Sequence, residues 1–293
     1  MFVITHRSIV ISAAALFTVL TLTPAAAAQE AQPGSNTAQS QSAPDVTAAG
    51  NDDASLVLAE PDFHVLNLPS TLRLPLYGSS FELTHRFNGN LRRGSFSGNA
   101  GNLFGLDQGA VVGFEYRFGI ARHLQAAVYR TAIDKTFQFS GKYDAVRQGD
   151  AIPVSLSALL SVEGADNFQE RYSPALGLVA SRVVADRLAI YATPVWVHNT
   201  AATLNIDRDT FFVGIGGRVR VSSTVYLVGE VAPRASGYSP DTPAYGFAIE
   251  KRVGGHLFQL NFNNGQGTTF AQLARGGFSD SLYLGFNLAR KFF

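Results

Sequence analysis

The sequence contains no cysteine among its 293 residues. This absence excludes a disulfide framework, a thiolate metal site and a lipid-modified N-terminal cysteine. A strong charge of one sign is also lacking, because 15% of the residues are charged and the formal net charge is +1. We therefore expect no nucleic-acid partner and no disordered acidic chain. Beyond the N-terminus no apolar run approaches roughly 20 residues without charges or glycines, so we expect no transmembrane helix.

The N-terminus has the three parts of a cleaved secretory signal. His6 and Arg7 precede an uncharged apolar run over 9–22, and Ala26-Ala27-Ala28 offers a small-residue cleavage site. We therefore predict a signal peptide over 1–28 and export of the mature chain.

The next segment is rich in Gln, Ser, Ala, Thr, Pro, Asn and Asp and poor in large apolar residues. Such a composition cannot offset the entropy lost on ordering, so we predict a disordered periplasmic leader over 29–65. Prolines at 69 and 75 interrupt strand pairing. The residues after 66 therefore lead into the barrel domain, which we assign to 66–293, and its wall begins near Phe81.

From there to the C-terminus, hydrophobic and polar residues alternate in segments of about 9 to 12 residues, the length of a tilted strand that crosses a bilayer. The pattern is clearest over 111–118, where Phe114 and Tyr116 oppose Glu115 and Arg117. It predicts an all-β fold, a single antiparallel barrel of about twelve strands in the outer membrane. The expected strands are 81–87, 110–118, 123–130, 136–144, 154–162, 174–183, 188–198, 211–221, 225–232, 245–252, 256–263 and 281–291.

An even number of strands puts both ends of the barrel on one side of the membrane. Short links at 119–122, 184–186, 222–223 and 253–255 alternate with longer ones. With a periplasmic N-terminus, the short links become periplasmic turns and most of the long links become outer loops. The short link 131–135 and the longer link 145–153 depart from this rule.

Most mid-strand charges keep to the polar phase, which faces the lumen, because a charge on the lipid face near the midplane costs about 2 to 4 kcal/mol. His85 is the main exception. These residues predict a lumen crowded with side chains of both charges. The charges either plug the lumen as a satisfied ion-pair network, which we favour, or line a narrow channel. The expected network is Glu115, Arg117, Lys142, Arg218, Arg220, Glu230, Glu250, Arg252 and Gln259.

Within this network, the turn at Ser222-Ser223 is expected to bring Glu230 close to Arg218 and Arg220. The glycines of Gly214-Ile215-Gly216-Gly217 are expected to make room for large neighbours such as arginines.

The sequence resembles a bacterial family of β-barrel proteins of unknown function over about 68–293. The resemblance implies a membrane barrel and supplies no activity, substrate or catalytic residue. Five short motifs carry it in order: Phe81-Glu82-Leu83-Thr84-His85-Arg86-Phe87; Gly105-Leu106-Asp107 with Gly113-Phe114-Glu115-Tyr116; Gly141-Lys142-Tyr143 with Arg147-Gln148; Gly214-Ile215-Gly216-Gly217-Arg218; and Gly254-Gly255-His256-Leu257-Phe258-Gln259-Leu260.

Motifs for metal binding and catalysis are weak. Asn205-x-Asp207-x-Asp209 imitates a calcium loop, but Thr210 and Gly216 replace the glycine and the acid that such a loop needs. We therefore expect no metal site and no cofactor. A hydrolase at the rim would need a base such as His198 near a serine, with Ser161 and Ser281 as candidates, and nothing in the spacing demands it.

The sequence thus predicts a non-enzymatic outer-membrane barrel that is a narrow pore or a structural scaffold. The alternatives are a rim enzyme acting on lipid or glycan, and a soluble secreted β-barrel or sandwich that binds a ligand. The expected partners are outer-membrane lipid and the assembly machinery. The last strand ends on Phe292 and Phe293, which resembles the C-terminal signal for that machinery, although the apolar phase leads to Phe292.

Overall fold

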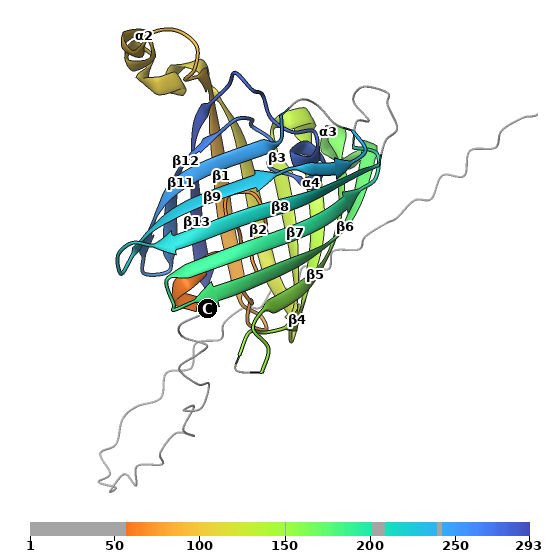
Figure 1. Cartoon of the computed structure of the whole chain (residues 1–293). Coiled ribbons are helices and arrows are strands. Elements are labelled where there is room, and N and C mark those ends of the chain that lie inside the picture. The colour runs from red at the N-terminus through yellow and green to blue at the C-terminus, as the bar shows by residue number, and fades with distance from the viewer. Residues whose placement is uncertain (1–56, 150, 201–208, 239–241) are drawn as a thin grey trace, which may run out of the picture. The chain divides into compact units, whose positions relative to one another are not determined.

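The computed structural model describes residues 57–149, 151–200, 209–238 and 242–293 (Figure 1). The expected signal peptide and most of the expected leader lie outside these residues, as do Asn205 and Asp207. The described chain begins at residue 57 rather than at the expected boundary of 66, and most residues of 57–65 are buried. Their partners are side chains far along the chain, so the composition of the segment could not show this order.

Each expected strand is present, with boundaries shifted by a few residues. Alternating apolar and polar side chains favour extended backbone wherever the two faces meet different surroundings. The strands are β1 (Ser79–Asn90), β2 (Ala110–Ala121), β3 (Leu124–Thr131), β4 (Phe137–Val146), β5 (Ser155–Gly164), β6 (Glu170–Val184), β7 (Leu188–Val197), β8 (Thr210–Arg220), β9 (Val225–Ala232), β10 (Arg234–Ser236), β11 (Ala244–Val253), β12 (His256–Asn263) and β13 (Tyr283–Phe292).

The strands form a closed antiparallel barrel. In the described residues the sheet has 13 strands, of which the three-residue β10 only extends the pairing of β8, so twelve form the ring. Apart from β10, strands that follow one another in the sequence pair with each other. Strand β9 pairs with both β8 and β11, which closes this part of the ring. The first and last strands also pair, with Ser79 opposite Phe292. The prediction of a twelve-stranded barrel is confirmed.

Both ends of the barrel domain lie at the same end of the ring, which we call the turn end (Figure 1). The short links at 119–122, 184–186, 222–223 and 253–255 lie there, and so does the longer link between β4 and β5, whereas the short link 131–135 lies at the opposite end. The opposite end, which we call the loop end, carries the remaining connections, including α2 (Phe96–Gly101), η1 (Leu103–Gln108), α3 (Ala165–Phe168) and α4 (Phe270–Ala274).

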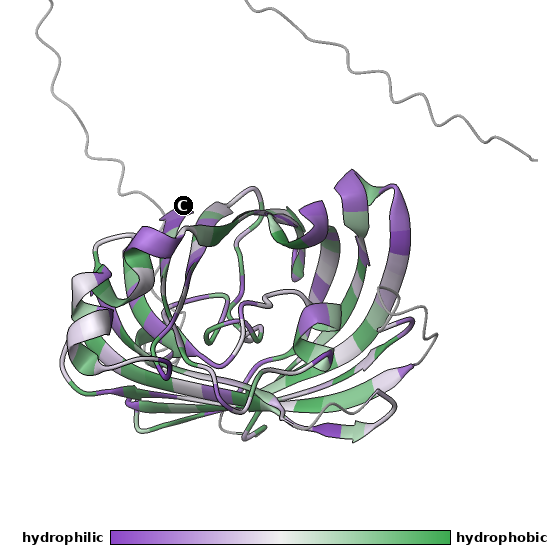
Figure 2. Ribbon diagram, turned by 90° about the horizontal axis from the view of Figure 1, so that it is seen from above, coloured by the Kyte–Doolittle hydropathy of each residue, from purple (hydrophilic) through white to green (hydrophobic). Residues whose placement is uncertain are grey.

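The two faces of the wall differ as predicted. Along β2, Glu115 and Arg117 are buried inside, whereas Phe114 and Tyr116 are about half exposed on the outer face. The strand ribbons accordingly alternate between hydrophilic and hydrophobic colours (Figure 2). Other large apolar side chains exposed on strands are Phe139, Leu160, Leu176, Leu178, Ile190, Ile215, Leu227, Phe247, Ile249, Phe258 and Leu260.

His85 departs from the charge pattern because it belongs to the outer face of β1. Its ring stacks on Phe286 with centroids 4.8 Å apart and also contacts Phe87. The lumen phase of β1 is carried by Glu82, Thr84 and Arg86, all buried. Among the described residues no helix is long and apolar enough to cross a bilayer.

The connection between β12 and β13 folds back into the barrel. Its short helix α4 begins at a capping box, in which the Thr269 hydroxyl accepts from the backbone N–H of Gln272, and all five helical residues are buried. Seen from above, coil and short helix cross the interior of the ring (Figure 2). The lumen is therefore filled with polypeptide as well as with side chains from the wall.

The lipid-facing assignment of the outer face predicts the effect of a charge placed on it. Leu160 lies mid-strand on β5 and is 58% exposed, so Leu160→Arg should lower the free energy of unfolding in a bilayer by about 2 to 4 kcal/mol. Ile152→Arg, in the link between β4 and β5, is the matched control and should change it by less than about 0.5 kcal/mol. Unfolding in lipid vesicles measures both, and equal small effects would contradict a lipid-facing wall.

Candidate functional site

The lumen is occupied by residues 57–74, which we call the lumen segment. Most of them are buried, whereas Pro75, Leu76 and Tyr77, which join the segment to β1, are exposed. The segment folds into a narrow hairpin in which Phe63 O accepts from Ser70 N at 2.8 Å and Val65 N donates to Leu68 O at 2.8 Å. Leu66 and Asn67 form its tip. The wall begins at Ser79, close to the expected Phe81.

Wall side chains bind the main chain of the lumen segment. Arg218 on β8 donates to His64 O at 2.8 Å, and Lys142 on β4 donates to Ser70 O and Leu72 O at 2.8 Å each. Buried backbone groups without partners are costly, and here the wall supplies the partners that a sheet or water would otherwise give. The other wall donors to segment carbonyls are Gln125 to Leu72, Tyr226 to Leu58, Gln259 to Val65, Asn287 to Leu66 and Lys291 to Pro61.

Glu230 on β9 holds the tip of the hairpin. Its Oε2 accepts from the backbone N–H groups of Leu66, Asn67 and Leu68 at 3.0 to 3.1 Å. Its Oε1 also accepts from Asn67 Nδ2 at 2.8 Å. Consecutive N–H groups of a turn make an anion-binding concavity, and a carboxylate is a strong acceptor for them.

Three glycines in the wall make sockets for aliphatic side chains of the hairpin. A Cβ on Gly214 would lie 2.6 Å from Leu68 Cδ2, one on Gly246 would lie 2.7 Å from Leu66 Cδ2, and one on Gly216 would lie 3.1 Å from Val65 Cγ1. The sequence predicted that the glycines of β8 make room for arginines. That prediction is corrected, because at 214 and 216 the room is taken by the lumen segment.

Among the described residues, Glu230 forms no ion pair with Arg218 or Arg220, although the sequence predicted that it would lie close to both. In the register of β8 and β9, Gly216 lies opposite Glu230 and Arg218 lies opposite Val228. Arg218 instead reaches past β9 to β11, where its Nε donates to Glu250 Oε1 at 2.8 Å and its Nη2 to Glu250 Oε2 at 2.9 Å. Both side chains are 0% exposed.

The remaining members of the expected network form separate groups. Arg117 pairs with Glu115 at 2.7 Å, and Lys142 with Asp144 at 3.3 Å. Gln259 donates to Glu250 as well as to the lumen segment. Arg220 lies at the end of β8, 3.5 Å from Asp186, and Arg252 is partly exposed near the end of β11. The lumen is therefore not closed by wall ion pairs alone, since several wall charges bind the segment.

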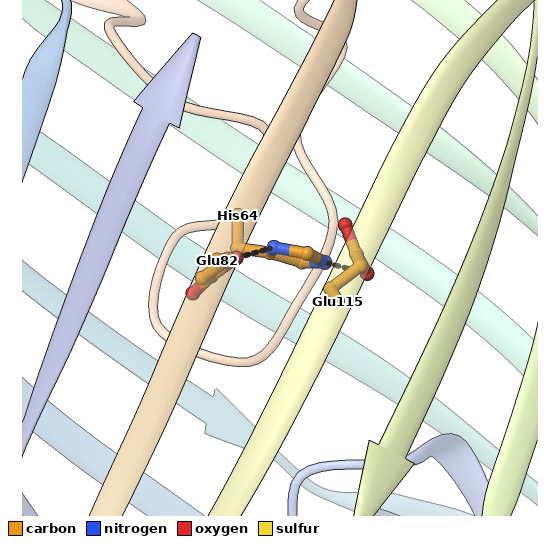
Figure 3. A group of neighbouring side chains, drawn as sticks. All are labelled: His64, Glu82 and Glu115. Carbon is orange, nitrogen blue, oxygen red and sulfur yellow. Dashed lines mark hydrogen bonds and ion pairs between the residues drawn. The ribbon is translucent and has the colours of Figure 1, made fainter.

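His64 of the lumen segment lies between two wall carboxylates (Figure 3). Its Nδ1 is 2.7 Å from Glu82 Oε2, and its Nε2 is 3.6 Å from Glu115 Oε2. Burial alone would lower the pKa of His64, but Glu115 and Glu82 outweigh burial and raise it to about 9. The segment is thus tied to β1 and β2 by an imidazolium.

The same three side chains offer ligand atoms within 4.8 Å of one another. The guanidinium of Arg117 nevertheless lies 3.4 Å from His64 Nε2 and 2.7 Å from Glu115 Oε1. A cationic side chain thus already occupies the position at which a metal ion would bridge this nitrogen and this carboxylate. The group is best described as two acids balanced by two bases.

Two small cavities remain around the hairpin tip. One lies beside His64, Glu82 and Glu115 and has about 30 Å³ of space, and the other lies between Glu230 and the β12–β13 connection and has about 10 Å³. A water needs about 10 to 15 Å³ by this measure, so these cavities have room for waters and not for a larger solute.

Some lumen residues were missed by the sequence analysis. Arg86 Nη2 donates to Asn67 Oδ1 at 2.9 Å, and its Nη1 donates to Asn287 Oδ1 at 2.7 Å. The alternation of Glu82, Thr84 and Arg86 against Phe81, Leu83 and Phe87 was a signal that could have identified the polar phase of β1. No such signal existed for His64, because it precedes the wall.

The candidate catalytic residues are not brought together. His198 Nδ1 lies 2.6 Å from Asp209 Oδ1 at the loop end. The side chain of Ser161 is buried on the inner face of β5, and Ser281 contacts Asn90. Neither serine has a described contact with His198.

A family model described as "Membrane bound beta barrel domain (DUF5777)" matches residues 62–292. The similar solved structures include the KdgM porin in complex with disordered oligogalacturonate, with 8% identity, a TM-score of 0.48 and coverage of 73% of this chain and 99% of that chain. The NanC porin has 6% identity, a TM-score of 0.47 and coverage of 73% and 100%. Omp33, an outer membrane protein of Acinetobacter baumannii, has 11% identity, a TM-score of 0.42 and coverage of 74% and 98%. No curated protein matches the sequence.

The buried Arg218–Glu250 pair yields a stability prediction. Glu250→Gln leaves a buried guanidinium without its carboxylate and should lower the free energy of unfolding in detergent by about 3 to 5 kcal/mol. Asp186→Asn breaks the more exposed pair with Arg220 and should cost less than about 1 kcal/mol. Chemical unfolding of the two variants measures the difference, and equal losses would contradict the assignment of Arg218–Glu250 as a buried pair.

The raised pKa of His64 yields a pH dependence with a definite sign. A histidine whose pKa rises on folding stabilises the fold fully below its ordinary value of 6.5, and this contribution is lost as the pH rises through about 9. Stability should therefore fall across that window in the wild type and less steeply in His64→Gln. Urea titrations at several pH values measure this, and parallel profiles would rule out His64 as the titrating group.

Proposed function

Because the chain belongs to the family of membrane-bound β-barrel domains, we propose that it is an outer-membrane pore which its own lumen segment holds closed. The carrying observation is that wall charges of the lumen bind the main chain of residues 57–74. A barrel built only as a scaffold could pair those charges with one another, as Arg218 and Glu250 do. Here the lumen is built around a piece of chain that is separable from the wall.

The segment can leave without breaking the barrel. The isolated β-bridge between His64 and Pro69 is internal to the hairpin, and the described ladders pair only wall strands with each other. The exposed residues Pro75 to Tyr77 form the covalent connection to β1. Departure would therefore cost side-chain hydrogen bonds and buried apolar contacts and would leave every ladder intact.

An emptied lumen would carry both signs of charge along its length. Water would fill a lumen with such a lining. A lining of this kind selects small polar or charged solutes. The basic side chains would be Arg86, Arg117, Lys142 and Arg218, and the acidic ones Glu82, Glu115, Asp144, Glu163, Glu230 and Glu250.

We further propose that the protein is not an enzyme and that β13 is its assembly signal. The first proposal is supported by the pairing of His198 with Asp209 away from both candidate serines. The second is supported by the outward phase of Leu284, Phe286 and Leu288, which leads to Phe292, 46% exposed at the turn end.

Glu230→Gln tests the closed-pore proposal. The substitution keeps the shape but removes the charge that holds the N–H groups of the hairpin tip, so openings in planar bilayers should become more frequent. Glu170→Gln, at the exposed start of β6, is the matched control and should behave as the wild type. A destabilised barrel that never conducts would support a structural plug instead.

A disulfide lock gives the decisive comparison. The hydroxyls of Thr71 and Ser181 are hydrogen-bonded, and the chain has no cysteine of its own, so Thr71→Cys with Ser181→Cys should join the segment to β6 alone. In the Glu230→Gln background, the oxidised protein should stay closed and the reduced protein should conduct. Equal conductance in both states would show that residues 57–74 do not close the pore.

A further inference from the structure

We propose that the lumen is a peptide-binding site, whose ligand is a short turn of polypeptide with aliphatic side chains. This inference rests on the proposed pore and specifies its substrate class. The lumen segment then occupies a site that can also accept a separate peptide of the same chemistry.

Side chains of the wall form hydrogen bonds with main-chain atoms of the hairpin. Glu230 accepts from three consecutive N–H groups, while Arg218, Gln259 and Asn287 donate to the carbonyls of the three consecutive residues 64–66. The wall thus offers one carboxylate to the N–H groups of residues 66–68 and three donors to the carbonyls of residues 64–66. Such a set fits a polypeptide turn, and a saccharide offers hydroxyls at other spacings and no row of N–H donors.

Apolar contacts of the hairpin also support a peptide ligand. Leu68 lies against Gly214 and in one buried cluster with Val195, Phe212 and Phe270, so the hairpin tip from the turn end meets α4 from the loop end. Val65 and Leu66 lie in a second cluster with Tyr191 and Tyr226.

These sockets add selectivity to the main-chain contacts. Adding even one methyl group at Gly214 would crowd Leu68, because the new Cβ would stand 2.6 Å from it. A ligand must therefore place aliphatic side chains of matching size at the positions of Val65, Leu66 and Leu68 around one turn. Glu230 adds the requirement that no acidic side chain lie at the tip.

The test uses the full chain with a protease site inserted between Leu76 and Tyr77, which are exposed. Cleavage in detergent leaves the segment bound without a covalent link, and a fluorescent peptide of residues 57–74 is then added in excess. Fluorescence anisotropy should report saturable uptake of this peptide. A scrambled peptide, a peptide with Leu66→Asp and Leu68→Asp, and oligogalacturonate should neither bind nor compete.

A complementary pair of changes separates recognition from general damage. Gly214→Ala in the wall should weaken uptake of the wild-type peptide by about five- to a hundredfold, and a Leu68→Ala peptide should restore it. Gly217→Ala, on the outer face of the same strand, is the matched control. Loss of uptake in Gly214→Ala without rescue would overturn the socket.

The outcomes are distinguishable from those of the pore test. Equal uptake of the scrambled peptide, competition by oligogalacturonate, or no uptake by the cleaved protein would each overturn the peptide site. If any of these occurred while the oxidised lock still abolished conductance, the closed pore would stand and only its peptide selectivity would fail.

Discussion

The structure depends on one constraint: polar groups inside a barrel that crosses a bilayer must find partners inside it. The Arg218 guanidinium meets this constraint by binding Glu250 and His64 O, at 0% exposure. Glu230 meets it through the N–H groups of the hairpin tip. The same bonds satisfy the backbone of the lumen segment, which has no ladder with the wall. In the closed barrel, wall and segment therefore satisfy each other's buried polar groups.

The wall could be predicted from the sequence because its signal is local. Strand alternation has a period of two, and one buried and one lipid-facing side impose it along every strand. His85 follows the alternation of β1 as well. It lies on the outer face, where its ring stacks on Phe286 of the neighbouring strand. The partners of the wall charges were harder to predict. Glu230 lies opposite Gly216, two positions from Arg218 along the ladder, and that register depends on how the β8–β9 turn is made.

The lumen segment could not be predicted for a different reason. Leu66 and the carboxylate that holds it are 164 residues apart, and no periodicity links them. Residues 57–65 were assigned to the leader because the wall side chains that bind them, such as Arg218 and Gln259, lie far along the chain. The glycines of β8 and β11 were a visible sign of a close approach, and the large neighbour was a leucine or valine of the segment rather than an arginine.

Main-chain bonds and glycine sockets have different consequences for what the lumen can hold. Bonds to N–H and C=O groups are nearly independent of side chains, so alone they would admit many sequences. Sockets of fixed depth reject side chains that are too large and leave a void beneath those that are too small. Together, the bonds and the sockets select the sequence of the turn. The described hydrogen bonds that the wall forms with this segment all come from side chains. A β-strand added to the sheet would be held by a continuous ladder, whereas this hairpin can be withdrawn with every ladder of the barrel in place.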